Sequence, residues 1–291
     1  MKRLTIFTPT YNRAYILPKL YDSLCEQTCN DFEWLVVDDG STDQTKELVE
    51  DWIKDKKISI RYVCQENGGK MRAYNKAVSL TETELFVCID SDDQLASEFV
   101  VVDSLTFWDE HKNDCLEKEI AGMVSLRSSS LEEQSMTMLS HGSLHDICSN
   151  YMGETTIFIL TQILCNYPYP SFDGENFITD VYIYYRMDED YCFLFHPYIS
   201  QKCDYHEDGY TMSYRHLLFK NPRGHREYHA QRIRLNKDGI VKSMICYIAL
   251  SLFICDHTMF SESPNKGLTI LLYPFGCLKY LYDCYMLRNG K

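Results

Sequence analysis

The sequence lacks the motifs that identify several common classes of nucleotide-binding and metal-binding protein. Neither Gly-x-Gly-x-x-Gly nor a P-loop pattern occurs, which excludes the usual dinucleotide and P-loop fingerprints. The 13 cysteines include no Cys-x-x-Cys pair, so the spacing typical of a zinc site is missing. Basic residues are also few. Because 29 Lys and Arg face 42 Asp and Glu, the net charge of -13 argues against nucleic acid as a partner.

Long hydrophobic runs are missing as well. The apolar stretch at the N-terminus is too short for a signal peptide, and no clean run of about 20 apolar residues is present. We therefore expect a cytoplasmic protein. In that reducing compartment the scattered cysteines, among them Cys64 and Cys88 in strand-like runs, are interpreted as small buried hydrophobic residues.

The first hundred residues alternate between short apolar runs and amphipathic segments. This alternation predicts an α/β fold with a mixed, mainly parallel sheet flanked by helices, whose ligands collect at the carboxyl ends of the strands. Ser41 and Gln44 have capping-box spacing for the start of one helix. Strands are expected at Leu4–Thr8, Glu33–Val37, Ile58–Cys64, Leu85–Ile89 and Met123–Leu126. Further helices are expected at Ala14–Gln27, Lys70–Leu80 and Glu175–Arg186.

Polar clusters follow several of these strands. Asp90-Ser91-Asp92-Asp93 comes directly after the run Leu85–Ile89, and carboxylates at such a strand end can bind a divalent cation together with nucleotide oxygens. The alternative is an acidic turn that caps the next helix.

Two further clusters carry weaker signals. Asp38–Asp43 has carboxylates followed by Gly and Thr, as in haloacid-dehalogenase phosphatases, but Val37 stands where their nucleophile would be. The alternative for Asp38–Asp43 is a turn whose polar side chains cap the N-terminus of the next helix. Asn67–Asn75 is a glycine-rich loop that enters a helix, where backbone amides and Lys70 could meet a phosphate.

Together with Thr8-Pro9-Thr10-Tyr11-Asn12-Arg13, these clusters closely resemble the motifs of family 2 glycosyltransferases with the GT-A fold. All four motifs stand in the family's order, and the resemblance is strongest over residues 1–100. Tyr74 departs from the pattern, because the family often has Arg there.

The resemblance implies roles for individual residues. Asp39 would accept a hydrogen bond from the base, expected to be a uracil, so that the donor would be a UDP-sugar. Asp92 would hold Mn²⁺ or Mg²⁺ on the diphosphate, and His206 is a second metal-ligand candidate, although a surface or hydrogen-bonded histidine is the alternative. The remaining nucleotide-binding candidates are Thr8, Pro9, Tyr11, Arg13, Lys70, Asp90 and Ser91.

The acceptor side needs a general base, and the resemblance offers two carboxylates. Asp180 has Arg186 at the family's usual distance of six residues, although Thr179 replaces the usual first acid. We predict Asp180 as the base and Glu175 as the second choice. Either acid could instead only form an ion pair with Arg186.

The last third of the chain changes in character. Between Arg215 and Lys242, eight Lys and Arg stand against two acidic residues, and the apolar segments Met244–Cys255 and Leu268–Leu287 follow. A basic stretch before apolar helices suits peripheral contact with an anionic membrane face, and equally a basic loop beside two core helices. We expect a glycosyltransferase domain over residues 1–214, with a nucleotide half at 1–100 and an acceptor half at 101–214, and a helical extension over 215–291.

These features predict a metal-dependent, inverting glycosyltransferase that moves a hexose or N-acetylhexosamine from a nucleotide-diphospho-sugar to a glycan or lipid-linked acceptor. The expected setting is cell-surface polysaccharide synthesis in the cytoplasm, at the inner face of the membrane. One alternative is a non-catalytic nucleotide-sugar-binding or scaffold protein on the same fold. Another is a nucleotidyltransferase, whose usual glycine-rich N-terminal loop is missing.

Overall fold

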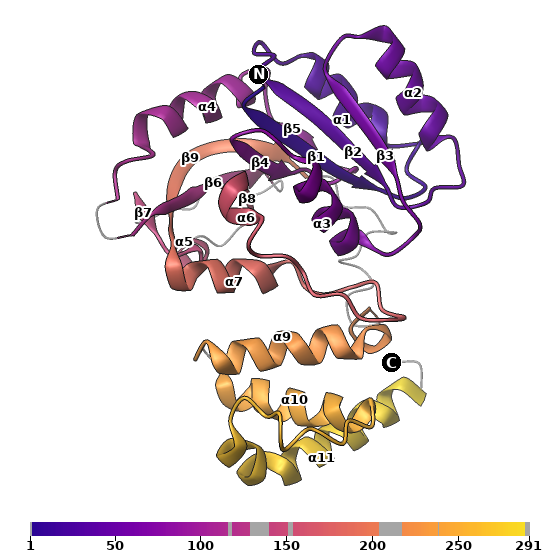
Figure 1. The fold of residues 1–291 in the computed structure, drawn as a ribbon, viewed down its shortest axis with the longest axis vertical. Helices are drawn as coiled ribbons and strands as arrows, with labels where there is room; N and C mark the ends of the chain where they lie inside the picture. The colour runs from indigo at the N-terminus through magenta and orange to yellow at the C-terminus, as the bar shows by residue number, and fades with distance from the viewer. Residues whose placement is uncertain are drawn as a thin grey trace. The chain divides into compact units, whose positions relative to one another are not determined.

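The computed structural model describes residues 2–115, 118–128, 140–150, 154–203, 217–237 and 239–288 (Figure 1). The chain divides into two compact units. The first contains Met1–Pro168 with Met187–Gly209, and the second contains Tyr169–Arg186 with Tyr210–Lys291. Residues 169–186 therefore group with the C-terminal helices, which differs from the boundary at 214 expected from the sequence.

Nine strands of the described residues form one mixed sheet in the first unit. In sheet order they are β3 (Ile60–Cys64), β2 (Phe32–Asp38), β1 (Leu4–Thr10), β4 (Leu85–Cys88), β8 (Thr155–Leu160), β6 (Ile120–Ser128), β9 (Cys192–Lys202) and β5 (Gln94–Leu95), with β7 (His141–Gly142) beside β9. The first four strands are parallel to one another, whereas β8 runs antiparallel to both β4 and β6. This mixed sheet with its flanking helices confirms the predicted α/β class.

Helices cover both faces of this sheet (Figure 1). They are α1 (Leu17–Cys25), α2 (Thr45–Asp55), α3 (Lys70–Leu80), α4 (Val100–His111), α5 (Leu144–Asn150) and α6 (Thr161–Leu164). Helices α1, α2 and α4 bury their apolar sides in one core with strand residues such as Ile6 and Trp34. Because side chains alternate along a strand, Phe7 faces the opposite side. There its ring meets Tyr74 of α3 at 5.6 Å, so Tyr74 is a core residue.

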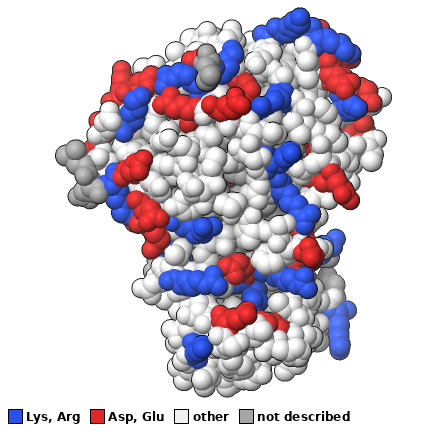
Figure 2. Space-filling view, viewed as in Figure 1, with Lys and Arg blue, Asp and Glu red and all other residues white. Residues whose placement is uncertain are grey.

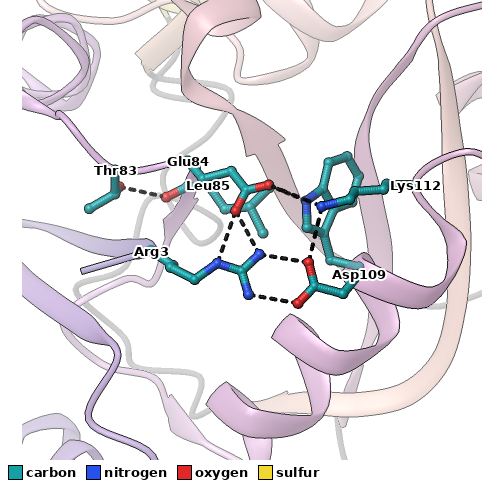
Figure 3. A network of polar contacts seen from close by, with 7 residues as sticks. Arg3, Thr83, Glu84, Leu85, Asp109 and Lys112 are labelled. Carbon is teal, nitrogen blue, oxygen red and sulfur yellow. Dashed lines mark hydrogen bonds and ion pairs between the residues drawn. The ribbon is translucent and has the colours of Figure 1, made fainter. Parts of the chain in front are cut away.

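A polar network joins the amino ends of β1 and β4 to α4 (Figure 3). The Arg3 guanidinium donates to Glu84 Oε2 at 2.6 Å and to both carboxylate oxygens of Asp109 at 2.7 and 2.8 Å. Trp108 Nε1 donates to the other oxygen of Glu84 at 2.8 Å. The hydrogen bonds to Arg3 hold the pKa of Asp109 at about 2. This network lies at the amino ends of the strands and therefore supports the sheet rather than the candidate site.

Some expected elements are confirmed and others are wrong. Helix α3 has the predicted bounds, but the predicted capping box of α2 is wrong. The helix begins at Thr45, and its N-cap residue Gln44 makes no side-chain cap bond. Ser41 instead accepts a hydrogen bond from the Asn12 amide at 2.8 Å. The expectation of buried cysteines is wrong for Cys64, which is exposed at the end of β3.

The second unit contains the helices α9 (Pro222–Arg234), α10 (Ile240–Phe253) and α11 (Lys266–Arg288). Its core includes Ala230 and Ile233 of α9, Met244, Tyr247 and Ile248 of α10, and Met259. No helix in the described parts of the chain is long and apolar enough to cross a membrane.

The helix expected at Glu175–Arg186 starts later than predicted, because α7 spans Val181–Asp190. The preceding segment is fixed by partners that lie far along the chain. Asn221 Oδ1 accepts hydrogen bonds from the amides of Asn176 and Phe177 at 2.8 and 3.1 Å. Since these amides bond to a side chain, residues 175–180 do not continue the helix.

Two histidines of α9 give the second unit a predicted pH dependence. His225 Nε2 and His229 Nε2 lie 3.0 Å apart. Burial lowers the pKa of His225 to about 4, and burial together with the neighbouring His225 lowers the pKa of His229 to about 2. Both values lie below the usual value of about 6.5, so acid protonates the unfolded chain first. Stability is therefore complete above about pH 6.5 and falls as the pH is lowered, down to about pH 4 for His225 and about pH 2 for His229, by up to about 1.4 kcal/mol per pH unit for each histidine.

We expect the amides of α9 to lose hydrogen-exchange protection at pH 5.5 relative to pH 7.5, after correction for intrinsic rates. The double variant His225→Gln/His229→Gln should lack this dependence. His111→Gln, which removes an exposed histidine of α4, serves as the control. An unaltered pH dependence in the double variant would assign the effect to other groups.

Candidate active site

The candidate site lies at the carboxyl ends of three adjacent parallel strands. Strand order β2-β1-β4 brings the turn Asp38–Asp43, the loop Thr8–Arg13 and the segment Asp90–Asp93 to one edge of the sheet. The loop Asn67–Gly69 enters α3 at the same edge, where the Gln65 amide donates to Asp38 O. The four motifs identified in the sequence are thus brought together by the topology.

Asn12 joins the first two of these segments. Its Oδ1 accepts from the amide of Thr42 at 2.8 Å, and Asp43 Oδ2 accepts from the amide of Ala14 at 3.0 Å. Asn12 has a positive φ of 55°, a conformation that asparagine tolerates better than most residues. The sequence motif contains Asn12, but sequence analysis assigned it no role.

The residues of the segment Thr8–Arg13 differ in how deeply their side chains are buried. Thr8 is fully buried, and its Oγ1 accepts from Trp34 Nε1 at 3.0 Å. Pro9 is half-buried, whereas Tyr11 is 49% exposed. Thr8 therefore positions the strand, and Tyr11 is available to a ligand at the strand end.

Asp39 organises the glycine-rich loop from the neighbouring strand end. Its Oδ1 accepts from Gln65 Nε2 at 2.8 Å and from the Gly68 amide at 2.9 Å, and its Oδ2 accepts from the Gly69 amide at 2.7 Å. Gly69 has φ +86°, a conformation that side chains rarely adopt. The carboxylate that was predicted to contact the base is thus also the group that shapes the start of α3.

Lys70 and Asp90 form an ion pair inside the site. Lys70 Nζ lies 2.8 Å from Asp90 Oδ1 and 2.9 Å from Oδ2. Burial alone would raise the pKa of Asp90, but Lys70 and the more distant Arg127 and Arg13 together hold it below the usual value. Arg13 thus brings a second positive charge close to the carboxylates of this edge.

Asp92 is the carboxylate of the site best placed to bind a cation. Burial, and then repulsion by Asp90, raise its pKa. No side chain of the described residues donates a hydrogen bond to Asp92, and the residue is half-buried. A hard cation would relieve the repulsion, so the donor chemistry fits Mg²⁺ or Mn²⁺.

A cation at Asp92 would draw most of its other ligands from elsewhere. The described part of the chain contains no group of three or more His, Cys, Asp and Glu side chains arranged to hold a metal ion. This fits the usual behaviour of Mg²⁺, which takes one or two carboxylates and completes its shell with phosphate oxygens and water.

Asp93 has a supporting role that sequence analysis missed. It is buried, pairs with Arg127 of β6 at 2.8 Å and accepts a hydrogen bond from Gln201 of β9. Burial raises its pKa to about 7, although the Arg127 charge lowers it. These contacts fix the loop that carries Asp92 to two strands distant in sequence. The buried Ser91 lies between Asp90 and Asp92.

The two candidates for the general base, Glu175 and Asp180, lie in the second unit and differ in the contacts and exposure of their side chains. Glu175 Oε1 and Oε2 accept from the amides of Arg223 and Gly224 at 2.8 Å each, so Glu175 caps the N-terminus of α9. Asp180 has an exposed side chain, while its carbonyl accepts from Tyr169 Oη at 2.8 Å. The metal-ligand candidate His206 lies outside the described residues.

Comparison with known proteins agrees with this architecture. Residues 5–116 match the model of glycosyl transferase family 2. The chain is 40% identical over 98 residues to a teichoic acid poly(glycerol phosphate) polymerase of Staphylococcus epidermidis. This alignment covers 33% of this chain and 14% of the polymerase. It is 33% identical over 125 residues to the poly(ribitol-phosphate) beta-N-acetylglucosaminyltransferase TarS of Staphylococcus aureus. This alignment covers 42% of this chain and 22% of TarS. The matches therefore span less than a quarter of these two relatives.

The fold extends the similarity beyond the matched sequence. The structure superposes on S. aureus TarS 1–349 in complex with UDP-GlcNAc with a TM-score of 0.61 and 20% identity, covering 89% of this chain and 76% of that one. The predicted GT-A fold is thus confirmed. Residues 5–116 thus match glycosyl transferase family 2 within a chain that has the GT-A fold.

Proposed function

We propose that the protein is an inverting glycosyltransferase that uses a nucleotide-diphospho-sugar, with UDP as the nucleotide. One observation carries the proposal: the half-buried Asp92, to which no side chain of the described residues donates a hydrogen bond, lies beside the Lys70–Asp90 ion pair at the carboxyl edge of the sheet. A nucleoside diphosphate needs both positive side chains and a cation-binding carboxylate. TarS, which shares the fold, has been solved with UDP-GlcNAc.

The residues of the first unit would bind and orient the donor. Tyr11 offers an exposed ring at the end of β1, and Asp39 keeps the Gly68–Gly69 loop in place beside the nucleotide. Lys70 and Arg13 would offset the charge of the diphosphate. Asp92, with Asp90 nearby, would hold Mn²⁺ or Mg²⁺, which when bound stabilises the negative charge of the departing diphosphate.

We propose Asp180 as the general base. Asp180 is exposed, whereas both oxygens of Glu175 are occupied by the amides at the start of α9. In our proposal Asp180 removes the proton of the acceptor hydroxyl as its oxygen attacks C1 of the sugar. A single displacement of this kind inverts the configuration at C1.

The acceptor class follows from the relatives. Their names describe a poly(glycerol phosphate) polymerase and a transferase that acts on poly(ribitol phosphate). We propose a glycan or lipid-linked acceptor of a cell-surface polymer, handled at the cytoplasmic face of the membrane with peripheral contact through the C-terminal region.

A donor screen tests the proposal. The full chain is incubated with a panel of UDP- and GDP-sugars with and without Mn²⁺, and release of the nucleoside diphosphate is measured. We expect slow hydrolysis of one UDP-sugar that requires the metal. If UDP binds with equal affinity with and without metal and no sugar is hydrolysed, a non-catalytic binding protein becomes the better description.

A further inference from the structure

The most deeply buried residues of α11 are small or polar, and several of its large apolar residues are exposed. Its buried residues are Thr269, Gly276 and Asp283. Leu268, Leu272 and Tyr273 pack, partly buried, against the core of the second unit. Seven large apolar residues on the outward side of the helix are between 54% and 68% exposed: Ile270, Leu281 and a set of five, Leu271, Phe275, Leu278, Tyr282 and Tyr285. A helix that faces water has the opposite arrangement. The outward side of α11 is therefore suited to an apolar environment.

The orientation of α11 is fixed by its inward contacts. A Cβ atom at Gly276 would lie 2.3 Å from Ile248 Cγ2 of α10, so only glycine permits this close approach. Thr269 Oγ1 donates to Met244 Sδ of α10 at 3.2 Å. Rotating the helix to bury its apolar side would break these contacts and expose α10. The outward side is thus a property of the folded unit.

The five residues of this set form one continuous stripe. They are spaced by four, three, four and three positions, which keeps them on one side of a helix. The stripe contains no charged residue, and the exposed charges of α11 are at its two ends, Lys266 and Arg288. In Figure 2 charged side chains gather over α9, and the visible surface below it, over α10 and α11, is mostly uncharged.

We propose that this stripe lies in the plane of an anionic phospholipid surface, with its apolar side chains at the acyl boundary and Lys266 and Arg288 among the headgroups. Charge favours lipid over a second copy of the chain. Residues 217–288 contain ten Lys and Arg against five Asp and Glu, in a chain whose net charge is -13. Two copies paired along α11 would place Lys266 beside Lys266 or Arg288, whereas anionic headgroups neutralise these charges.

This proposal rests on the proposed function and refines it by locating the membrane contact on α11. Vesicle binding tests it without any catalytic readout. The full chain is sedimented with vesicles of phosphatidylcholine, with and without phosphatidylglycerol. Phe275→Gln/Leu278→Gln should weaken binding to both kinds of vesicle by about tenfold or more, because two exposed apolar side chains no longer insert.

Two further variants separate the contributions. Phe99→Gln/Ile199→Gln changes two similarly exposed apolar residues of the first unit and should bind vesicles like the unmodified chain. Lys266→Glu/Arg288→Glu should lose the preference for phosphatidylglycerol and its salt dependence.

Light scattering and UDP calorimetry are run on the same proteins. Absent vesicle binding, or a dimer that Phe275→Gln/Leu278→Gln converts to a monomer, would overturn the proposal and make the stripe a subunit interface. If the membrane proposal fails but the chain still binds UDP, the donor proposal is unaffected. If the unmodified chain does not bind UDP, that result counts against the donor proposal alone.

Discussion

Replacing Asp92 by Asn should reduce glycosyl transfer by about 10²-fold or more, in the range found when one group that stabilises transition-state charge is removed. The substitution keeps the shape of the side chain but removes the charge that would bind the metal. Calorimetry with UDP should show that Mn²⁺ no longer increases affinity.

The same substitution should not destabilise the fold, which separates a functional from a structural role. Repulsion by Asp90 contributes to the raised pKa of Asp92, so a neutral Asn removes an unfavourable interaction at neutral pH. Urea unfolding should show equal or slightly higher stability. Glu66→Gln, which neutralises an exposed carboxylate in the loop before α3, is the matched control and should leave transfer and metal dependence unchanged. An Asp92→Asn protein that keeps its Mn²⁺ dependence would remove Asp92 from the metal site.

Replacing Asp180 by Asn should reduce transfer by about 10²–10⁴-fold, the usual contribution of a general base. The amide cannot take the acceptor proton, while the donor-binding residues belong to the other unit and are unchanged. The dissociation constant for UDP should therefore remain within about twofold. A lower kcat with unaltered donor binding indicates an interaction used in the transition state.

Glu175→Gln is the matched control for this experiment. Because Glu175 caps α9 through the amides of Arg223 and Gly224, its neutralisation should cost about 1 kcal/mol of stability and leave kcat nearly unchanged. The base assignment passes to Glu175 if its variant loses transfer and Asp180→Asn does not. If both variants retain full activity, neither carboxylate is the base.

The sequence by itself determined the alternation of the first hundred residues and the edge of the sheet where the candidate site lies. Both depend on short-range signals. The bounds of α3 follow from Gly69 before it and a helical pattern over Lys70–Leu80. Once β1, β2 and β4 are parallel neighbours, their polar carboxyl ends must meet, because parallel strands begin and end at the same edges of a sheet.

The tertiary structure alone decided which side chain does what at that edge. Asp93 looks like Asp90 and Asp92 in the sequence, yet it is held by Arg127 and Gln201, which lie 34 and 108 residues away. Similarly, Glu175 is a cap because its two amide partners come from 48 and 49 residues along the chain. No local pattern encodes such partners.

The polarity of α11 shows the same limit most clearly. The sequence contains an apolar segment at Leu268–Leu287, but its composition does not say which side is buried. That was decided by the close approach of Gly276 to Ile248 and by the hydrogen bond from Thr269 Oγ1 to Met244 Sδ, both partners being on α10. Packing against α10 is set by shape and by the need to satisfy buried polar groups, and these depend on a neighbouring helix rather than on the segment itself.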